Sequence, residues 1–193
     1  MKILAMADLH SNKINLPDLT DIDVIMVAGD LTNIGDELEY KKIFKFLSSL
    51  KKPVIYVLGN HDNRIDFYYI KKRYETTDMY FLDNKIMEFN GYKIYGTSYS
   101  TYCGWWNHYF TLEECQELTI PKEKVDIILC HEPPMIPELS DRFKANNELL
   151  KYLHEKTGIT VISGHIHERT GACIEINGNK CYNVAKTYKI IEV

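Results

Sequence analysis

The chain has 193 residues, of which 45% are hydrophobic and 26% are charged, with a formal net charge of −4. This composition is typical of a globular protein and excludes the fibrous, low-complexity and intrinsically disordered classes. The length fits one domain of ordinary size, so we expect residues 1–193 to form a single domain. The acidic balance argues against a nonspecific nucleic-acid binder, which usually carries a clustered positive field.

The five cysteines form no CxxC motif and cannot all pair within one chain, which favours a reducing compartment and a cytoplasmic location. The N-terminal segment reaches a charged Asp8 before it could supply the apolar core of a signal peptide. No apolar run approaches membrane-spanning length. We therefore expect neither export nor membrane insertion.

Short apolar runs recur along the chain, and each is closely followed by Gly, Asp, Asn or His. They cover residues 2–7, 23–28, 53–58, 125–130 and 159–163. Continuous apolar runs of this length are typical of strands that are buried on both faces.

A helix is expected between the second and third runs. Asp36 can cap its N-terminus, Glu39 is the capping-box partner three positions later, and Pro53 prevents continuation. The expected apolar face consists of Leu38, Ile43, Phe44, Leu47 and Leu50. This helix and its two flanking strands form a β-α-β unit.

The remaining elements are less regular. Further helices are expected after Asn63, from near Thr111, and from Asn146 to Thr157. Asn90-Gly91 and Asn177-Gly178 each separate two β-like runs, which predicts type I′ hairpins of antiparallel strands. We therefore expect an α/β fold with mixed sheets.

All five apolar runs are followed by residue types that bind metals. These residues are Asp8 and His10, Asp30, Asn60 with His61 and Asp62, His131, and His165 with His167. Binding sites in α/β sheets form outside the carboxyl ends of the strands, so we expect these side chains to converge on one rim. Glycines that permit tight turns precede Asp30, Asn60 and His165.

The spacing and the donor types point to a metal site. Asp8 and His10 are two residues apart, as are His165 and His167, so each pair can face the same way in an extended chain. Any single motif of this kind is most often a cap or a turn. Together the motifs offer more donors than one tetrahedral site uses, and they include no thiolate, so two metals fit better.

The ordered set DxH, GD, GNHD, H and GHxH, spanning residues 8 to 167, resembles the calcineurin-like metallophosphoesterase superfamily. The resemblance implies a sandwich of two mixed β-sheets flanked by helices. It also implies two metal sites that share Asp30. One would be formed by Asp8, His10, Asp30 and His167, and the other by Asp30, Asn60, His131 and His165.

Two divalent ions can clamp a phosphoryl group and lower the pKa of a bridging water, so that hydroxide attacks in line. Mixed imidazole, carboxylate and amide ligation suits Mn²⁺, which we favour, and also Fe, Co, Ni or Zn. His61 is left without a metal and is a candidate for protonating the departing oxygen, with Asp62 orienting its ring. Asp62 could equally cap the helix that follows.

Departures within the superfamily bear on the substrate. Protein Ser/Thr phosphatases carry an aspartate and an arginine shortly after the GD motif, where this chain has residues 31–34, LTNI. The chain has only four arginines, and a dianionic monoester benefits most from guanidinium clamps, so we favour a small phosphodiester substrate. The segments IYGTS, HEPP and GHIHE are similar to a branch that includes cyclic-nucleotide phosphodiesterase-like proteins.

Other interpretations stay open at this point. A phosphomonoesterase or a nuclease could use the same site, and a non-catalytic scaffold could keep the fold and bind protein partners. The loop at residues 97–110 is rich in Tyr, Trp and Phe. It could stack on a nucleobase, form a homo-oligomer contact, or pack into the core.

Overall fold

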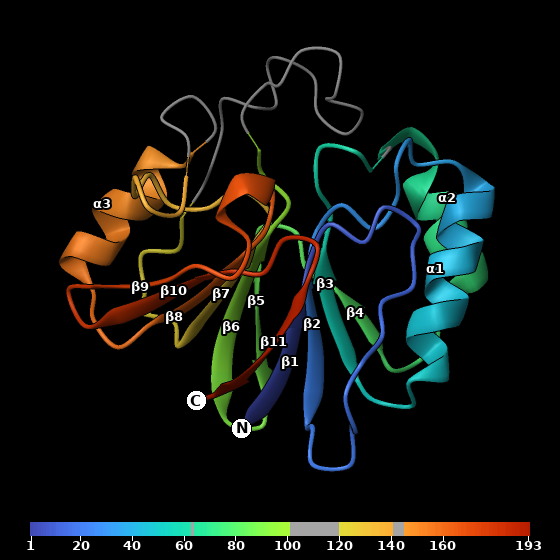
Figure 1. The fold of residues 1–193 in the computed structure, drawn as a ribbon, viewed down its shortest axis with the longest axis horizontal. Helices are drawn as coiled ribbons and strands as arrows, with labels where there is room; N and C mark the ends of the chain where they lie inside the picture. Colours follow the sequence, from blue (N-terminus) through green and yellow to red (C-terminus); the bar gives the residue numbers. More distant parts are fainter. Residues whose placement is uncertain (63, 101–119, 141–144) are drawn as a thin grey trace.

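The computed structural model describes residues 1–62, 64–100, 120–140 and 145–193, and for residues 64–66 it describes the backbone only. Within these ranges two mixed β-sheets face each other, with α1 and α2 covering one outer face and α3 the other (Figure 1). The expected two-sheet α/β sandwich with flanking helices is confirmed. The helix expected near Thr111 and most of the aromatic loop at 97–110 lie outside the described residues.

The first sheet has the strand order β11-β1-β2-β3-β4. Its strands are β1 (Lys2–Met6), β2 (Val24–Ala28), β3 (Val54–Val57), β4 (Met79–Phe81) and β11 (Tyr188–Glu192). β11 runs antiparallel to β1, and the other neighbours are parallel. The apolar runs predicted β1 to β3 but missed the two edge strands, because β4 has only three residues and β11 buries only Ile191.

The second sheet has the strand order β5-β6-β7-β8-β10-β9. Its strands are β5 (Lys85–Phe89), β6 (Tyr92–Thr97), β7 (Ile127–Cys130), β8 (Thr160–Ser163), β9 (Cys173–Ile176) and β10 (Asn179–Asn183). Both predicted hairpins are present as antiparallel pairs. Asn90, Gly91, Asn177 and Gly178 all have positive φ, as type I′ turns require.

Side chains of the central strands alternate between two buried environments. In β1, Ile3 and Ala5 point into the core between the sheets, while Leu4 and Met6 pack toward α1 and α2. A third cluster joins the outer face of the second sheet to α3. Because the parallel strands are covered on both faces, their sequences are continuously apolar, and this makes them recognisable from the sequence.

The helices begin largely where their caps predict. α1 (Glu37–Ser49) is capped by Asp36, whose side chain accepts a hydrogen bond from the backbone N–H of Glu39 at 2.8 Å. The expected place of Leu38 on the apolar face is wrong, because Leu38 is 75% exposed and Tyr40 is buried instead. α2 spans Arg64–Tyr74. α3 (Asn147–Glu155) is capped by Asn146 and ends two residues before the expected Thr157.

The loops that follow β1, β2, β3, β7 and β8 lie toward the same end of the sandwich, opposite the two termini (Figure 1). A short 3₁₀ helix, His167–Arg169, follows β8 at this end. None of the described helices has the length and apolarity needed to span a membrane. The architecture therefore brings the strand-end residues of both sheets to one rim.

Candidate metal centre

The backbone is locally unusual where the predicted ligands follow their strands. Asp8, His10, Asp30 and His165 all have positive φ, between 45° and 70°, although none is glycine. Residues held in this way cost roughly 1–3 kcal/mol each and persist only where the surroundings enforce them. Here the loops are tied together by hydrogen bonds from Asp8 N to Gly29 O and from His10 N to Asp30 O, both 3.0 Å.

Three glycines pack directly against the candidate ligands. A Cβ on Gly59 would overlap Asp30 Oδ1, and one on Gly164 would overlap Asp8 Oδ2. A Cβ on Gly29 would lie 2.6 Å from His131 Nδ1. Among these three glycines, only Gly29 has a positive φ. Glycine at positions 59 and 164 is thus required by close approach to the ligands, and not by the turn geometry that the sequence pattern suggested.

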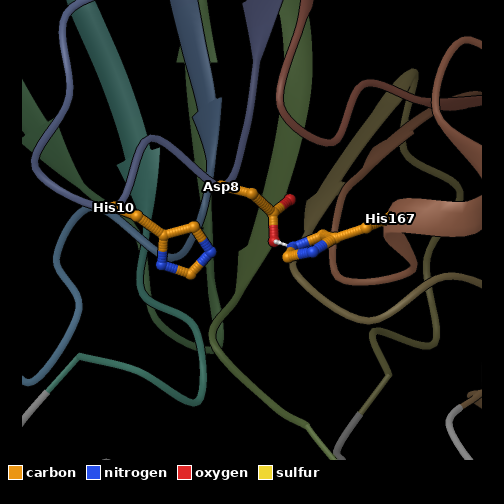
Figure 2. Close-up of side chains that lie close together, drawn as sticks. All are labelled: Asp8, His10 and His167. Atoms are coloured by element: carbon orange, nitrogen blue, oxygen red, sulfur yellow. Dashed lines mark hydrogen bonds and ion pairs between the residues drawn. The ribbon is translucent and has the colours of Figure 1, made fainter.

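The first group of candidate ligands combines the ends of β1 and β8. His167 Nε2 lies 3.0 Å from Asp8 Oδ1, and one ligand atom from each of Asp8, His10 and His167 lies within 4.8 Å of the others. Figure 2 shows the two imidazoles on either side of the Asp8 carboxylate. His10 Nδ1 lies 3.2 Å from the carbonyl oxygen of Thr32, which can only accept, so Nε2 carries the lone pair.

The second group lies at the end of β7. His131 Nδ1 is 2.9 Å from the carbonyl oxygen of Ala28, so the lone pair is again on Nε2. That atom lies 3.0 Å from Asn60 Oδ1, 3.4 Å from Asp30 Oδ1 and 3.1 Å from His165 Nδ1. Nitrogen and oxygen atoms that can act as ligands lie close together here, and a bound cation would remove the repulsion between their lone pairs.

Asp30 joins the two groups. Its Oδ1 lies toward His131, while its Oδ2 lies 3.8 Å from His10 Nε2. The backbone N–H of His61 donates to Oδ1 at 2.9 Å and holds the carboxylate in this orientation. Asp30 therefore lies between the two groups of side chains.

The electrostatics of the site favour cations. Burial raises the pKa of Asp30 well above its usual value, and the negative charges of Asp8 and Asp62 raise it further. Burial would also raise the pKa of Asp8, but the hydrogen bond and charge of His167, together with His131, lower it overall. Burial lowers the pKa of His10 to about 4, so its imidazole is neutral near pH 7, as a ligand must be. The donor set thus fits divalent metal ions.

His61 and Asp62 occupy different environments. His61 Nδ1 lies 2.7 Å from the carbonyl oxygen of Asn33, and its ring stands edge-on to His10 with centroids 4.9 Å apart. One ligand atom of His61 also lies within 4.8 Å of His10 and Asp30, close enough to contact a shared cation. The neighbouring imidazole and carboxylate groups show that His61 belongs to the same site.

The Asp62 carboxylate, which was expected to orient the ring of His61, is bound to the backbone of the neighbouring loops. The buried Asp62 carboxylate accepts from the backbone N–H groups of Gly59, Leu31 and Thr32, and from Thr32 Oγ1. Burial raises its pKa despite these bonds. Asp62 therefore joins the loop after β3 to the loop after β2. Its bonds satisfy backbone N–H groups that would be costly to leave unpaired in these buried loops.

The site opens into a cavity of about 540 Å³. It is lined by five of the seven predicted ligands, His10, Asp30, Asn60, His165 and His167, and by His61. The sequence interpretation missed four other lining residues, Asn12, Asn33, Glu168 and Lys186. Asn12, Asn33 and Glu168 follow the recognised motifs closely, which was an available signal, whereas nothing in the sequence pattern pointed to Lys186.

Two histidines lay outside the predicted motifs. His154 is exposed in the last turn of α3 and does not line this cavity. His108 lies outside the described residues. Arg169, beside the GHxH motif, is exposed and is absent from the cavity lining, in keeping with a surface position.

A two-sheet α/β sandwich with imidazoles and buried carboxylates gathered on its strand-end rim fits the class of metal-dependent phosphoesterases. The chain belongs to the calcineurin-like phosphoesterase family, whose sequence model matches residues 1–169. The resemblance stated from the motifs is thereby confirmed. Members of this family use divalent metals, in agreement with the candidate ligand groups.

Curated relatives are similar at low identity. A "probable cyclic nucleotide phosphodiesterase" of Xenorhabdus bovienii is 29% identical over 166 residues, covering 79% of this chain and 64% of the relative. The human "Metallophosphoesterase domain-containing protein 1" is 27% identical over 221 aligned positions, covering 93% of this chain and 66% of the relative. The chain thus spans about two thirds of the length of these relatives.

Solved structures support the fold. The protein TT1561 of Thermus thermophilus is similar with a TM-score of 0.65 and 16% identity, covering 94% of this chain and 88% of that one. Another crystal structure has a TM-score of 0.68 and 13% identity, covering 99% and 98% of the two chains. At these identities the likeness concerns the fold alone.

Proposed function

We propose that the chain is a dimetal phosphodiesterase that acts on a small or nucleotide phosphodiester. The observation that carries this proposal is the placement of Asp30 between the His10 and His131 imidazoles, with distances of 3.8 and 3.4 Å to its two oxygens. One carboxylate that faces two separate imidazole groups is the arrangement that a pair of cations requires.

The residues of the site have distinct roles in this proposal. Asp8, His10, Asp30 and His167 would hold one cation, and Asp30, Asn60, His131 and His165 the other. Divalent ions held by these residues would supply positive charge to a phosphoryl group and would make a water molecule a better nucleophile. Manganese is the metal that we propose, on the basis of this mixed donor set.

His61 is the proposed proton donor to the departing oxygen. Its Nδ1 faces the Asn33 carbonyl, which requires a proton on Nδ1, so the ring would donate from Nε2 as the imidazolium and be left neutral with hydrogen on Nδ1. His61 lines the cavity, so the ring is within reach of a substrate. A positioned general acid of this kind contributes about 10²–10⁴-fold to the rate.

The cavity lining favours a diester over a monoester. Among the described residues that line it, Lys186 is the only lysine or arginine. A dianionic monoester gains most from bidentate guanidinium groups, whereas a diester carries less charge to be balanced. The name of the Xenorhabdus bovienii relative supports a nucleotide diester as the substrate to test.

The test is a metal-supplemented hydrolysis screen. It compares p-nitrophenyl phosphate, bis(p-nitrophenyl) phosphate and the 2′,3′- and 3′,5′-cyclic nucleotides, each with Mn²⁺, Fe²⁺, Co²⁺, Ni²⁺ or Zn²⁺. We expect diesters to be hydrolysed faster than the monoester, with Mn²⁺ effective. Asp30→Ala should abolish turnover, and the exposed His154→Ala should not change it. Turnover of the monoester alone, or full activity of Asp30→Ala, would contradict the proposal.

His61→Ala separates proton donation from metal binding. We expect this variant to retain two metal ions per chain by elemental analysis while its turnover of a poor leaving group falls by about 10²-fold or more. Loss of a metal ion from the variant would instead make His61 a ligand.

A further inference from the structure

Glu39 makes contacts that the capping-box pattern did not anticipate. Its carboxylate accepts from Asn33 N at 3.2 Å, from Asn33 Nδ2 at 2.8 Å and from Ile34 N at 3.0 Å. Asp36 alone supplies the side-chain cap of α1. The Glu39 side chain therefore bonds to the loop after β2. This loop carries Asp30 and lines the cavity.

Asn33 is clamped from two sides. Besides its bonds to Glu39, its Nδ2 lies 3.0 Å from the carbonyl oxygen of His10. Asn33 is otherwise exposed, so a solvent-facing turn is held in one conformation by one carboxylate and one carbonyl. The backbone oxygen of the same residue lies 2.7 Å from His61 Nδ1.

We propose that Glu39 is a positioning residue, which acts through Asn33 to fix the orientation of the His61 ring. The proposal rests on the proposed function, in which His61 delivers a proton. A carbonyl oxygen can only accept, so the His61–Asn33 bond exists only while Nδ1 carries hydrogen, and Nε2 is directed to the cavity. The imidazolium keeps this bond while its Nε2–H is given to the departing oxygen, which leaves the neutral ring protonated at Nδ1. If the turn moved, the ring would lose its hydrogen-bond partner and, in its neutral form, the preference for hydrogen on Nδ1.

The chain offers a control that separates positioning from helix stability. Both Glu39 and Asp36 belong to the start of α1, but the Asp36 side chain bonds the helix backbone and not the Asn33 turn. Asp36→Ala therefore weakens the helix start and leaves the clamp on Asn33, whereas Glu39→Ala removes the clamp. Glu39→Gln retains one acceptor oxygen and should give an intermediate effect.

The kinetic test is a double-mutant cycle with Mn²⁺ and a diester that has a poor leaving group, such as a 2′,3′-cyclic nucleotide. We expect Glu39→Ala to lower kcat by about tenfold or more, within the 10²–10⁴-fold that a general acid supplies, with KM and metal content unchanged. In the His61→Ala background, Glu39→Ala should cause no further loss. An equal loss in both backgrounds, or an equal loss for Asp36→Ala, would overturn the proposal.

A second measurement does not depend on turnover. In the metal-free protein, ¹⁵N NMR of the imidazoles should show His61 as a single tautomer protonated at Nδ1, in the native chain and in Asp36→Ala. Glu39→Ala, or Glu39→Gln if the alanine variant does not fold, should show a mixture of tautomers. An unchanged tautomer would overturn the inference. A native chain with the fixed tautomer but no turnover on any phosphoester would instead refute the proposed function.

Discussion

His131 Nδ1 lies 2.9 Å from the carbonyl oxygen of Ala28, the last residue of β2. This contact is one of those that link the second sheet to the first. It places hydrogen on Nδ1 of the buried neutral imidazole and directs Nε2 toward Asp30 and Asn60. A metal-ligating histidine typically donates its other ring N–H in this way. The site is therefore held by the packing of the two sheets, and changes to that packing should be detectable as changes in metal binding.

Asp30→Asn should stabilise the metal-free protein. The pKa of Asp30 is raised in the folded state by burial and by the charges of Asp8 and Asp62, so its ionised form opposes folding at neutral pH. Asparagine removes that charge and retains an acceptor for His61 N. We expect Tm without metal to rise by about 2–4 °C for each kcal/mol relieved, and metal binding to be lost. Thermal unfolding with and without Mn²⁺ measures both effects.

The exposed Asp21→Asn is the matched control for this charge change. It should alter neither Tm nor metal content. A lower Tm for metal-free Asp30→Asn than for the native chain would show that Asp30 is not under electrostatic strain.

His10 should make the metal-free protein sensitive to mild acid. Burial lowers its pKa to about 4, below the ordinary value of 6.5, so its stabilising contribution is complete above about pH 6.5. That contribution is lost as the pH falls from 6.5 toward 4, with an upper bound of about 3 kcal/mol before solvent screening. His10→Gln should flatten the decline of unfolding free energy over this range in urea titrations. An equal decline in His10→Gln and in the native chain would assign it to other groups.

Gly164→Ala tests the close approach at the site. The added Cβ would overlap Asp8 Oδ2 and lie 2.5 Å from Ala7 Cβ, so we expect a loss of about 1–3 kcal/mol in unfolding free energy and weaker metal binding. Gly171→Ala is the comparison, because Gly171 has φ of 81° but no atom within 4 Å of a Cβ. It should lose roughly 1 kcal/mol through backbone strain and bind metal normally. Denaturant unfolding and metal titration distinguish the two; equal effects would contradict the packing argument.

Lys186 should contribute to substrate affinity. It lines the cavity with His167 and Glu168, and its backbone N–H bonds Ala7 O at 3.0 Å beside Asp8. We expect Lys186→Gln to raise KM for bis(p-nitrophenyl) phosphate by about 2–5-fold with kcat unchanged, the size of an exposed charge contact. The exposed Lys13→Gln is the control. Steady-state kinetics that show no change in KM for Lys186→Gln would remove it from the binding surface.

The sequence predicted the elements whose burial is complete. β1, β2, β3, β7 and β8 are covered on both faces, so nearly every residue in them is apolar and the pattern is unambiguous. The edge strand β11 carries no such signal, since Tyr188 and Ile190 are partly exposed. Its pairing with β1 is a long-range contact that local patterns do not encode.

The position of the candidate site could be predicted in the same way, but the hydrogen bonds that support it could not. Residues that follow parallel strands converge because the strands share a direction, so the meeting of these side chains at one rim could be predicted from their positions. The partners of His61 and Asp62 depend on how the loops after β2 and β3 fold against each other. His61 Nδ1 lies 2.7 Å from the backbone oxygen of Asn33, and such a contact has no sequence signature.

The central claim is that these side chains bind two cations with Asp30 between them. Anomalous diffraction from a crystal soaked in Mn²⁺ tests it most directly. The account predicts two manganese peaks per chain, one beside Asp8, His10 and His167 and one beside Asn60, His131 and His165, with an oxygen of Asp30 contacting each. No peak, a single peak, or peaks that do not contact Asp30 would contradict it.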